Sequence, residues 1–351
     1  MENNLIVSTS PHVRDPINTR NIMCKVILAL SPVAIYAIVV FGLSALWILL
    51  ASIAGAILGE FLMQKGRRLP LTLDDCSALL TGLILALTLP PTLPWWIAGI
   101  GGLTATILGK QIFGGLGHNI FNPALVGRAV IFVSWTAYFN NGYLRSAAIG
   151  IANTSAHQRI IDAVGGATPL AAMGAVYDPS KSPFVPQGIA GSNYYRPLLF
   201  ANPWGCMGEV SALLLILGGI YLVITRVIDW RIPVSYVGTV AVLTIITGRD
   251  PLFYMLAGGL LIGAIYMATD YTTSPLARRG KLVYGLGLGL ITWLLRFWSN
   301  YPEGVMFSIL FMNGLVPLID RYILPRRYGK RHVVQRVNFG APLLIRLAHA
   351  V

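Results

Sequence analysis

Charged side chains are scarce in this sequence. Only 11% of its 351 residues are Asp, Glu, Lys or Arg, while 55% are hydrophobic. A soluble domain carries about 25% charged residues, because water must wet its surface. Most of the outer surface of this chain therefore faces something other than water. Since a bilayer admits only structures that satisfy their own backbone hydrogen bonds, we expect an all-α polytopic membrane protein.

Clustered metal ligands are also missing. The three cysteines, Cys24, Cys76 and Cys206, lie far apart with no CxxC pair, which argues against a self-contained zinc or iron–sulfur site. The five histidines are scattered, which argues against a haem held by two of them. Without a Rossmann fingerprint, the chain cannot oxidise NADH unaided. We therefore expect no catalytic or metal-binding residues, and partner subunits for any redox role.

Hydrophobic windows of about 20 residues, the length that crosses a bilayer, recur along the chain. They predict about ten transmembrane helices. A rigid proline-rich turn at 90–94 separates the third window from the fourth. The windows cover residues 22–41, 43–63, 75–93, 95–113, 121–138, 208–228, 232–248, 252–271, 282–299 and 304–323.

Basic residues alternate between the connecting segments. The two tails and the connections after the second, fourth, sixth and eighth windows hold most of the 26 Lys and Arg residues. Positive charge marks the cytoplasmic side of a membrane protein, so both termini are predicted to be cytoplasmic. The same bias explains the net charge of +13 without a nucleic-acid partner.

The polar segment 139–207 is too long for an ordinary connection and too polar to cross the bilayer. We expect it on the outer, periplasmic face, with a disordered linker as the alternative. It separates five windows in 22–138 from five in 208–323, and leaves 1–21 and 324–351 as cytoplasmic tails. An odd number of crossings gives the two five-helix halves opposite orientations, which is typical of an inverted repeat.

A polar stretch closed by proline follows one window in each half, at residues 117–124 and 269–276. Proline lacks an N–H group, so carbonyl and amide groups beside it are available to hold a ligand. Asn122 and Asp270 are the polar groups of interest. The alternative is that both stretches are ordinary helix caps.

Thr168 stands in the sharpest motif of the outer segment, Gly-Gly-Ala-Thr-Pro. The small residues before it would let a bulky group approach the backbone. No Lys or His lies beside the hydroxyl to activate it, which argues against self-catalysed chemistry. Thr168 is therefore either modified by another enzyme or part of a simple turn.

The run from Asp162 to Thr168, Asp-Ala-Val-Gly-Gly-Ala-Thr, resembles the flavinylation motif of a family of membrane proteins. The family is that of the membrane subunits of the sodium-pumping NADH:quinone reductase and the Rnf complex, and the resemblance to the D subunits of Rnf complexes covers nearly the whole chain. Gly165 stands where the family usually has Ser or Thr, whereas Gly166 and Ala167 are kept. Other similar segments are residues 10–12, 117–124, 208–212, 267–275, 301–306 and 313–320.

The resemblance implies two flavins. FMN would be joined through its phosphate to the hydroxyl of Thr168 by a separate flavin transferase outside the cytoplasm. A non-covalent riboflavin is implied within the helix bundle. We place it beside the two proline-closed stretches, with Asn119, Asn122 and Asp270 as contacts inferred from the repeat.

The resemblance also implies a function in electron transport in the bacterial inner membrane. Membrane and peripheral subunits of one complex would couple electron transfer, of the ferredoxin or NADH type, to translocation of sodium ions or protons. This chain would be a translocase subunit that is not catalytic alone.

Two other functions fit the same sequence. A secondary transporter for a small solute, built on the same repeat, would have a site at mid-membrane and no covalent flavin. A structural anchor would leave Thr168 unmodified.

Charged residues near the window ends are expected to be caps or snorkelling groups, with Arg128 and Glu209 as candidates for a deeper role. The charged residues near the window ends are Glu60, Lys110, Arg128, Glu209, Asp229, Asp250, Asp270 and Arg296.

Overall fold

The computed structural model describes residues 18–139, 195–200, 205–299 and 304–323. Every regular element within these residues is helical. Three of the helices are long and apolar enough to cross a bilayer, in agreement with the expected all-α membrane protein. They are α1 (Thr19–Phe41), α2 (Leu43–Gly66) and α15 (Val305–Tyr322).

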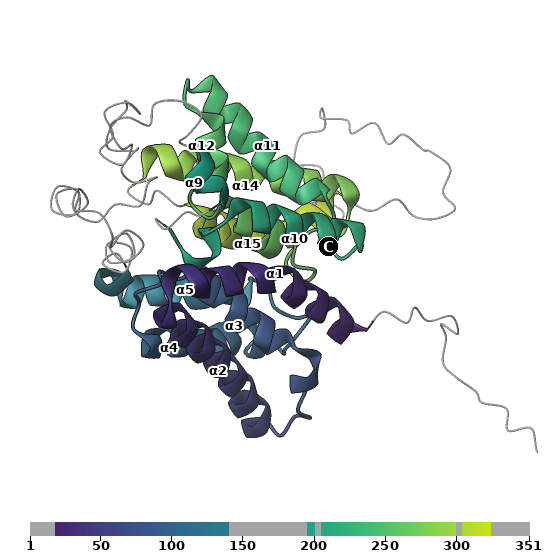
Figure 1. The fold of residues 1–351 in the computed structure, drawn as a ribbon. Coiled ribbons are helices and arrows are strands. Elements are labelled where there is room, and N and C mark those ends of the chain that lie inside the picture. The colour runs from purple at the N-terminus through teal and green to yellow at the C-terminus, as the bar shows by residue number, and fades with distance from the viewer. Residues whose placement is uncertain (1–17, 140–194, 201–204, 300–303, 324–351) are drawn as a thin grey trace, which may run out of the picture.

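The helices form two groups that pack against each other (Figure 1). The N-terminal group contains α1, α2, η1 (Leu73–Asp75), α3 (Ser77–Leu87), α4 (Trp95–Thr106), the π-helix η2 (Ile107–Gln111) and α5 (Pro123–Ser134). The C-terminal group contains α9 (Tyr195–Phe200), η4 (Met207–Glu209), α10 (Ala212–Ile224), α11 (Arg231–Ile246), α12 (Pro251–Leu256), α13 (Leu260–Ile262), the π-helix η5 (Gly263–Met267), α14 (Arg278–Trp298) and α15.

Short polar side chains fix where several helices begin. The side chain of Asn18 accepts a hydrogen bond from the backbone N–H of Thr19 at the start of α1 (2.9 Å). Asn122 and Asp250 each stand before a proline and accept backbone N–H groups at the starts of α5 and α12. These residue types satisfy N–H groups that have no partner within the helix, and proline suits the first helical position.

Glycine lets the helices of the N-terminal group approach closely. A methyl group at Gly102 of α4 would lie 2.1 Å from the carbonyl oxygen of Ser52 in α2, and one at Gly55 of α2 would lie 2.1 Å from the carbonyl oxygen of Gly99. No side chain fits at these distances. Such contacts between small residues replace the hydrophobic effect as the source of helix association in lipid.

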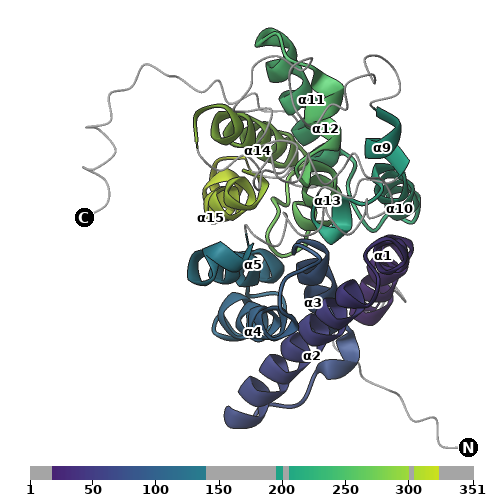
Figure 2. The same ribbon diagram turned by 60° about the vertical axis from the view of Figure 1, so that its left-hand side comes forward.

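The two groups meet along α1 and α5. Helix α1 packs against α10, and α5 packs against α15 (Figure 2). The backbone approach is again close, since a methyl group at Gly218 of α10 would lie 2.7 Å from the carbonyl oxygen of Ala29 in α1. On another part of this boundary, the N–H of Met207 donates to the carbonyl of Leu89 (3.2 Å).

The window predicted at 252–271 is not one continuous helix. Gly258 and Gly259 adopt φ angles of 72° and 67°, which L side chains rarely take, and they separate α12 from α13. The buried side chain of Arg296 donates to the carbonyl oxygens of Tyr254 (2.6 Å), Ala257 (3.1 Å) and Gly258 (3.2 Å). Arg296 thus acts as a cap, because it satisfies carbonyls left free where α12 ends.

Candidate functional site

A partly open cavity of about 80 Å³ lies between the two helix groups. Val26 of α1 and Leu80 of α3 contribute apolar wall on one side, and Leu222 of α10 contributes it on the other. Much of its polar lining comes from the segments that follow the two π-helices. Asn119, Asn122, Asp270 and Thr272 all line this cavity.

Asn119 and Asp270 are joined through Thr272. The side-chain amide of Asn119 donates to the hydroxyl of Thr272 (2.8 Å), and that hydroxyl donates to the carboxylate of Asp270 (3.0 Å). Asn119 is 5% exposed, and its Oδ1 atom has no hydrogen-bond partner among the described residues. A buried amide oxygen without a partner is costly, so this atom is suited to accept a donor from a bound molecule.

Asn122 has two functions in the structure. Its Oδ1 accepts the backbone N–H groups of Ala124 (3.1 Å) and Leu125 (3.4 Å), which makes it the cap of α5. Its Nδ2 donates across the group boundary to the carbonyl of Met267 (3.2 Å). The cap expected as the alternative is therefore present, and the same side chain also links the two groups.

A π-helix precedes each of the two polar segments. A π-helix closes hydrogen bonds five residues apart, is rare, and occurs frequently at functional sites. The backbone carbonyl of the last residue in each π-helix accepts a hydrogen bond from a side chain outside that π-helix. Arg67 donates to the carbonyl of Gln111 at the end of η2 (2.8 Å), and Asn122 donates to that of Met267 at the end of η5.

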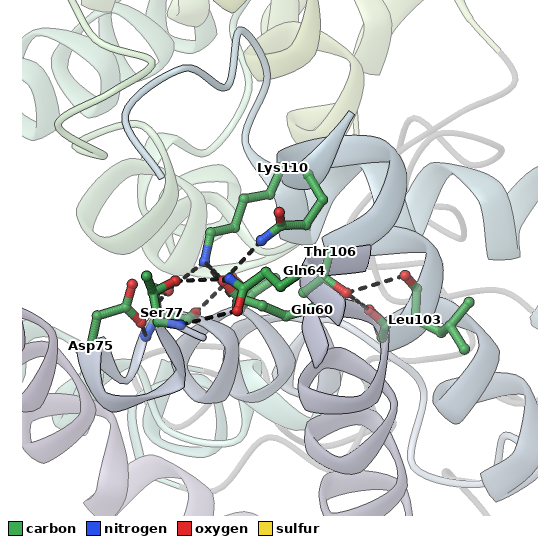
Figure 3. Close-up of polar contacts among 11 residues, drawn as sticks. Glu60, Gln64, Asp75, Ser77, Leu103, Thr106 and Lys110 are labelled. Atoms are coloured by element: carbon green, nitrogen blue, oxygen red, sulfur yellow. Dashed lines mark hydrogen bonds and ion pairs between the residues drawn. The ribbon is translucent and has the colours of Figure 1, made fainter. Parts of the chain in front are cut away.

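A buried ion pair borders the cavity. Figure 3 shows the polar contacts around this pair. Lys110 of η2 and Glu60 of α2 are 1% and 0% exposed, and the Lys110 ammonium lies 2.6 and 2.9 Å from the two carboxylate oxygens. Lys110 also donates to the hydroxyl of Ser77 (2.5 Å), which in turn donates to Asp75 (2.6 Å). Both Lys110 and Ser77 line the cavity, so the charged cluster and the cavity form one site.

The π-turn brings two consecutive side chains to one carboxylate. The amide of Gln111 donates to Glu60 Oε1 (2.9 Å) beside the ammonium of Lys110. Adjacent residues of an α-helix point about 100° apart around the axis, because about 3.6 residues make one turn. A π-turn holds more residues and separates neighbours less. The amide of Gln64, one helical turn beyond Glu60, is a further donor to this carboxylate (3.0 Å).

Sequence comparison places the chain in a family. A family model described as NQR2, RnfD, RnfE matches residues 6–329. The chain belongs to this family. Its relatives include the D subunit of the Na(+)-translocating ferredoxin:NAD(+) oxidoreductase complex of Acetobacterium woodii. That relative is 40% identical over 331 residues, which cover 93% of this chain and 96% of the relative.

Two further relatives give the same picture. The D subunit of the proton-translocating ferredoxin:NAD(+) oxidoreductase complex of Clostridium ljungdahlii is 40% identical, covering 94% of this chain and 98% of the relative. The D subunit of the ion-translocating oxidoreductase complex of Halorhodospira halophila is 38% identical, covering 95% and 96%. This chain thus matches these relatives over nearly their whole length.

The structure brings together three of the seven candidate flavin contacts predicted from the sequence. Asn119, Asn122 and Asp270 line one cavity. The other four, Thr168 with Asp162, Gly166 and Ala167, lie outside the described residues. The two polar segments do not occupy equivalent places, because the first follows the fourth long helical segment of its group and the second follows the third.

Sequence reasoning missed the pairing of Glu60 with Lys110. Both were expected at the membrane interface, yet both are buried. A signal was present, because a charge within an apolar window requires a partner. Arg128 and Glu209, the two candidates for a deeper role, are also buried, and the Arg128 guanidinium donates to the sulfur of Cys206 (3.6 Å).

The basic connections of this family member gather at one end of the bundle. The carboxylate of Asp229, between α10 and α11, lies 3.0 Å from the guanidinium of Arg231 and 3.1 Å from the ammonium of Lys281. Lys281 is in the first turn of α14. Burial acts to raise the pKa of the Asp229 carboxyl, but a backbone N–H of Arg231 and the charges of Lys281 and Arg231 together lower it. The cavity lies at this same end, because Asp270, Tyr271 and Thr272 belong to the connection that leads to Lys281.

Proposed function

We propose that this chain is the electron-carrying D subunit of a membrane complex that couples electron transfer to translocation of sodium ions or protons. The match to the NQR2, RnfD, RnfE family over residues 6–329 carries the proposal. Support also comes from relatives named as subunits of Na(+)- and proton-translocating ferredoxin:NAD(+) oxidoreductase complexes. Because they are subunits, this chain acts with other membrane and peripheral subunits and is not an enzyme by itself.

We propose that Thr168 carries FMN as a phosphoester. The support is the run Asp162 to Thr168 with its Gly166-Ala167-Thr168 ending and the family membership of the chain. The hydroxyl needs an external catalyst, so a flavin transferase is a required partner during assembly.

We propose that the cavity forms part of the site of a second, non-covalent flavin, with riboflavin as the ligand. The Oδ1 of Asn119 would accept an N–H or hydroxyl donor, and the carboxylate of Asp270 would accept another. Apolar side chains such as Leu80 and Leu222 would exclude water from the ring. A flavin supplies one- and two-electron redox chemistry, while the protein supplies its position and electrostatics. Its ring is larger than the cavity and would extend through the open side.

We propose that the helices form an inverted repeat of two five-helix halves in a bacterial inner membrane, with cytoplasmic termini. The support is a recurring packing order, in which α2 contacts α3 and α4, and α4 contacts α5. In the C-terminal group α11 contacts α12 and α14, and α14 contacts α15. The cavity then lies near the cytoplasmic face, because its lining adjoins the basic connections.

A secondary transporter remains the competing function. The observation in its favour is that the cavity lies between two helix groups, as in transporters of repeat architecture, although those bind substrate near the middle of the bilayer. This alternative gives the cavity a solute and leaves Thr168 unmodified.

The first test is the intact mass of the chain, purified under denaturing conditions from its native membranes, beside Thr168→Ala and Thr168→Ser. We expect an added mass equal to FMN less one water, with ultraviolet in-gel fluorescence, in wild type. Both signals should be lost in Thr168→Ala and kept in Thr168→Ser, which retains a hydroxyl. An unmodified wild-type chain, from cells with an active flavin transferase, would favour the transporter.

The second test concerns the cavity. Native protein carrying Thr168→Ala should release riboflavin on denaturation, detected by chromatography. Adding Asn119→Ala or Asp270→Asn should remove that riboflavin. Asp250→Asn is the matched control, because it makes the same change at a helix cap that does not line the cavity. Riboflavin retained in all of these variants would exclude this cavity as its site.

A further inference from the structure

Two cysteine side chains from different helices meet beside the cavity. Cys24 lies in the second turn of α1 and Cys76 immediately precedes α3, and the two positions are 52 residues apart in the chain. Their sulfur atoms are 4.0 Å apart. Two sulfurs at this distance need to close by about 2 Å to form a disulfide bond.

The backbone fixes the position of Cys76. It has a φ angle of 61°, and it is one of three non-glycine residues in the described part of the chain with positive φ. Its N–H donates to the carbonyl of Leu73, and its sulfur lies 3.8 Å from the carbonyl of Asp74. A non-glycine residue in this conformation is uncommon, so the surrounding turn holds the thiol in place.

The two thiols differ in access. Cys24 is exposed and Cys76 is partly buried. A dissolved reagent reaches an exposed thiol more readily than a partly buried one. Cys24 is therefore the better attacking group, and Cys76 is the resolving group.

We propose that Cys24 and Cys76 form a redox-active dithiol, which low-molecular-weight disulfides oxidise to an intramolecular disulfide. The Cys24 thiolate attacks the small disulfide, forms a mixed disulfide and releases one small thiol. The Cys76 thiolate then attacks the Cys24 sulfur and releases the second small thiol. Two electrons pass to the reagent, and the two protons of the cysteines end on the released thiols.

The disulfide would join two walls of the cavity. Met23 and Ser77 are the sequence neighbours of Cys24 and Cys76, and both line the cavity. Ser77 also accepts the hydrogen bond from Lys110. Oxidation would therefore link α1 covalently to the start of α3 at the edge of the cavity, next to the buried ion pair. Reduction would remove this link and leave only the packing of α1 on α3.

The test uses the assembled complex in native membranes. Membranes are reduced, or treated with oxidised glutathione, and the thiols are then labelled with a maleimide before the chain is isolated for mass measurement. Cys206 is buried beside Arg128 and does not line the cavity, so it serves as an internal reference. We expect oxidation to abolish labelling of both Cys24 and Cys76 and to lower the unlabelled mass by about two daltons, the mass of two hydrogen atoms. Dithiothreitol should restore both.

Single variants Cys24→Ser and Cys76→Ser separate the outcomes. In Cys76→Ser, Cys24 should retain bound glutathione, because no resolving thiol is present. In Cys24→Ser, Cys76 should label as in reduced protein. The proposal is overturned if wild-type Cys24 and Cys76 label equally before and after oxidation, if glutathione stays on wild-type Cys24, or if the chain forms disulfide-linked dimers instead.

Discussion

The buried pair of Glu60 and Lys110 gives the sharpest prediction, because the two residues lose different contacts when their partner is removed. In Lys110→Met, the carboxylate of Glu60 keeps the amides of Gln64 and Gln111 as donors. In Glu60→Leu, the ammonium of Lys110 keeps one acceptor among the described residues, the Ser77 hydroxyl, and both amides lose the carboxylate.

The magnitude follows from these contacts. Removing one member of a buried ion pair costs about 3–5 kcal/mol, whereas replacing both members with apolar residues is often close to neutral. We expect Lys110→Met near the lower value of about 3 kcal/mol, since Glu60 keeps two donors. Glu60→Leu should approach about 5 kcal/mol. The double variant Glu60→Leu, Lys110→Met should be less destabilised than either single variant.

The assay is thermal unfolding of the complex in detergent, followed by the loss of monodisperse chain on size-exclusion chromatography. Melting temperatures should rise in the order Glu60→Leu, Lys110→Met, double variant, wild type. A double variant that loses the sum of the two single losses would refute the reasoning, since it would mean that the two charges do not compensate each other.

Three further predictions concern other parts of the chain. Gly102→Ala should destabilise the chain by about 1–3 kcal/mol through overpacking and so lower the melting temperature of the complex. Gly238→Ala should not lower it, since a methyl group there meets nothing within 4 Å. Because the pKa of Asp229 is lowered, the stability that this carboxylate contributes is complete above the ordinary carboxyl pKa and is lost as the pH falls through the lowered value. Melting temperatures measured across acid pH should therefore fall more steeply in wild type than in Asp229→Asn. Asn119→Asp should bind riboflavin more weakly in equilibrium dialysis than wild type, because Asn119 also donates to Thr272 through the amide that the change removes; unchanged binding would contradict that role.

Helix positions were largely predictable from the sequence. The window 22–41 corresponds to Thr19–Phe41, and 43–63 corresponds to Leu43–Gly66, because about 20 apolar residues suffice to mark a crossing. The break within 252–271 was not predicted. Its signal is the pair Gly258-Gly259, but the sequence alone does not reveal that both take positive φ.

The candidate site was predictable only in part. Asn122 and Asp270 stood out because each lies in a polar stretch closed by proline, and the structure brings them to one cavity. Their contacts were not predictable, since Asn119 and Thr272 are 153 residues apart. Local patterns report helix faces and caps, whereas pairings such as that of Glu60 with Lys110 depend on how helices pack. The flavin at Thr168 stays a prediction.

The close contact of α2 with α4 has a mechanical consequence. Where Gly55 and Gly102 meet backbone carbonyls, not even a methyl group fits, so neither helix has room to rotate or slide against the other. A rigid block of this kind transmits force rather than absorbing it. The polar contacts of Asn119 with Thr272 and of Asn122 with Met267 cross the boundary between the two helix groups and can break and re-form, so we expect displacement during turnover there rather than between α2 and α4. The cavity lies along this boundary.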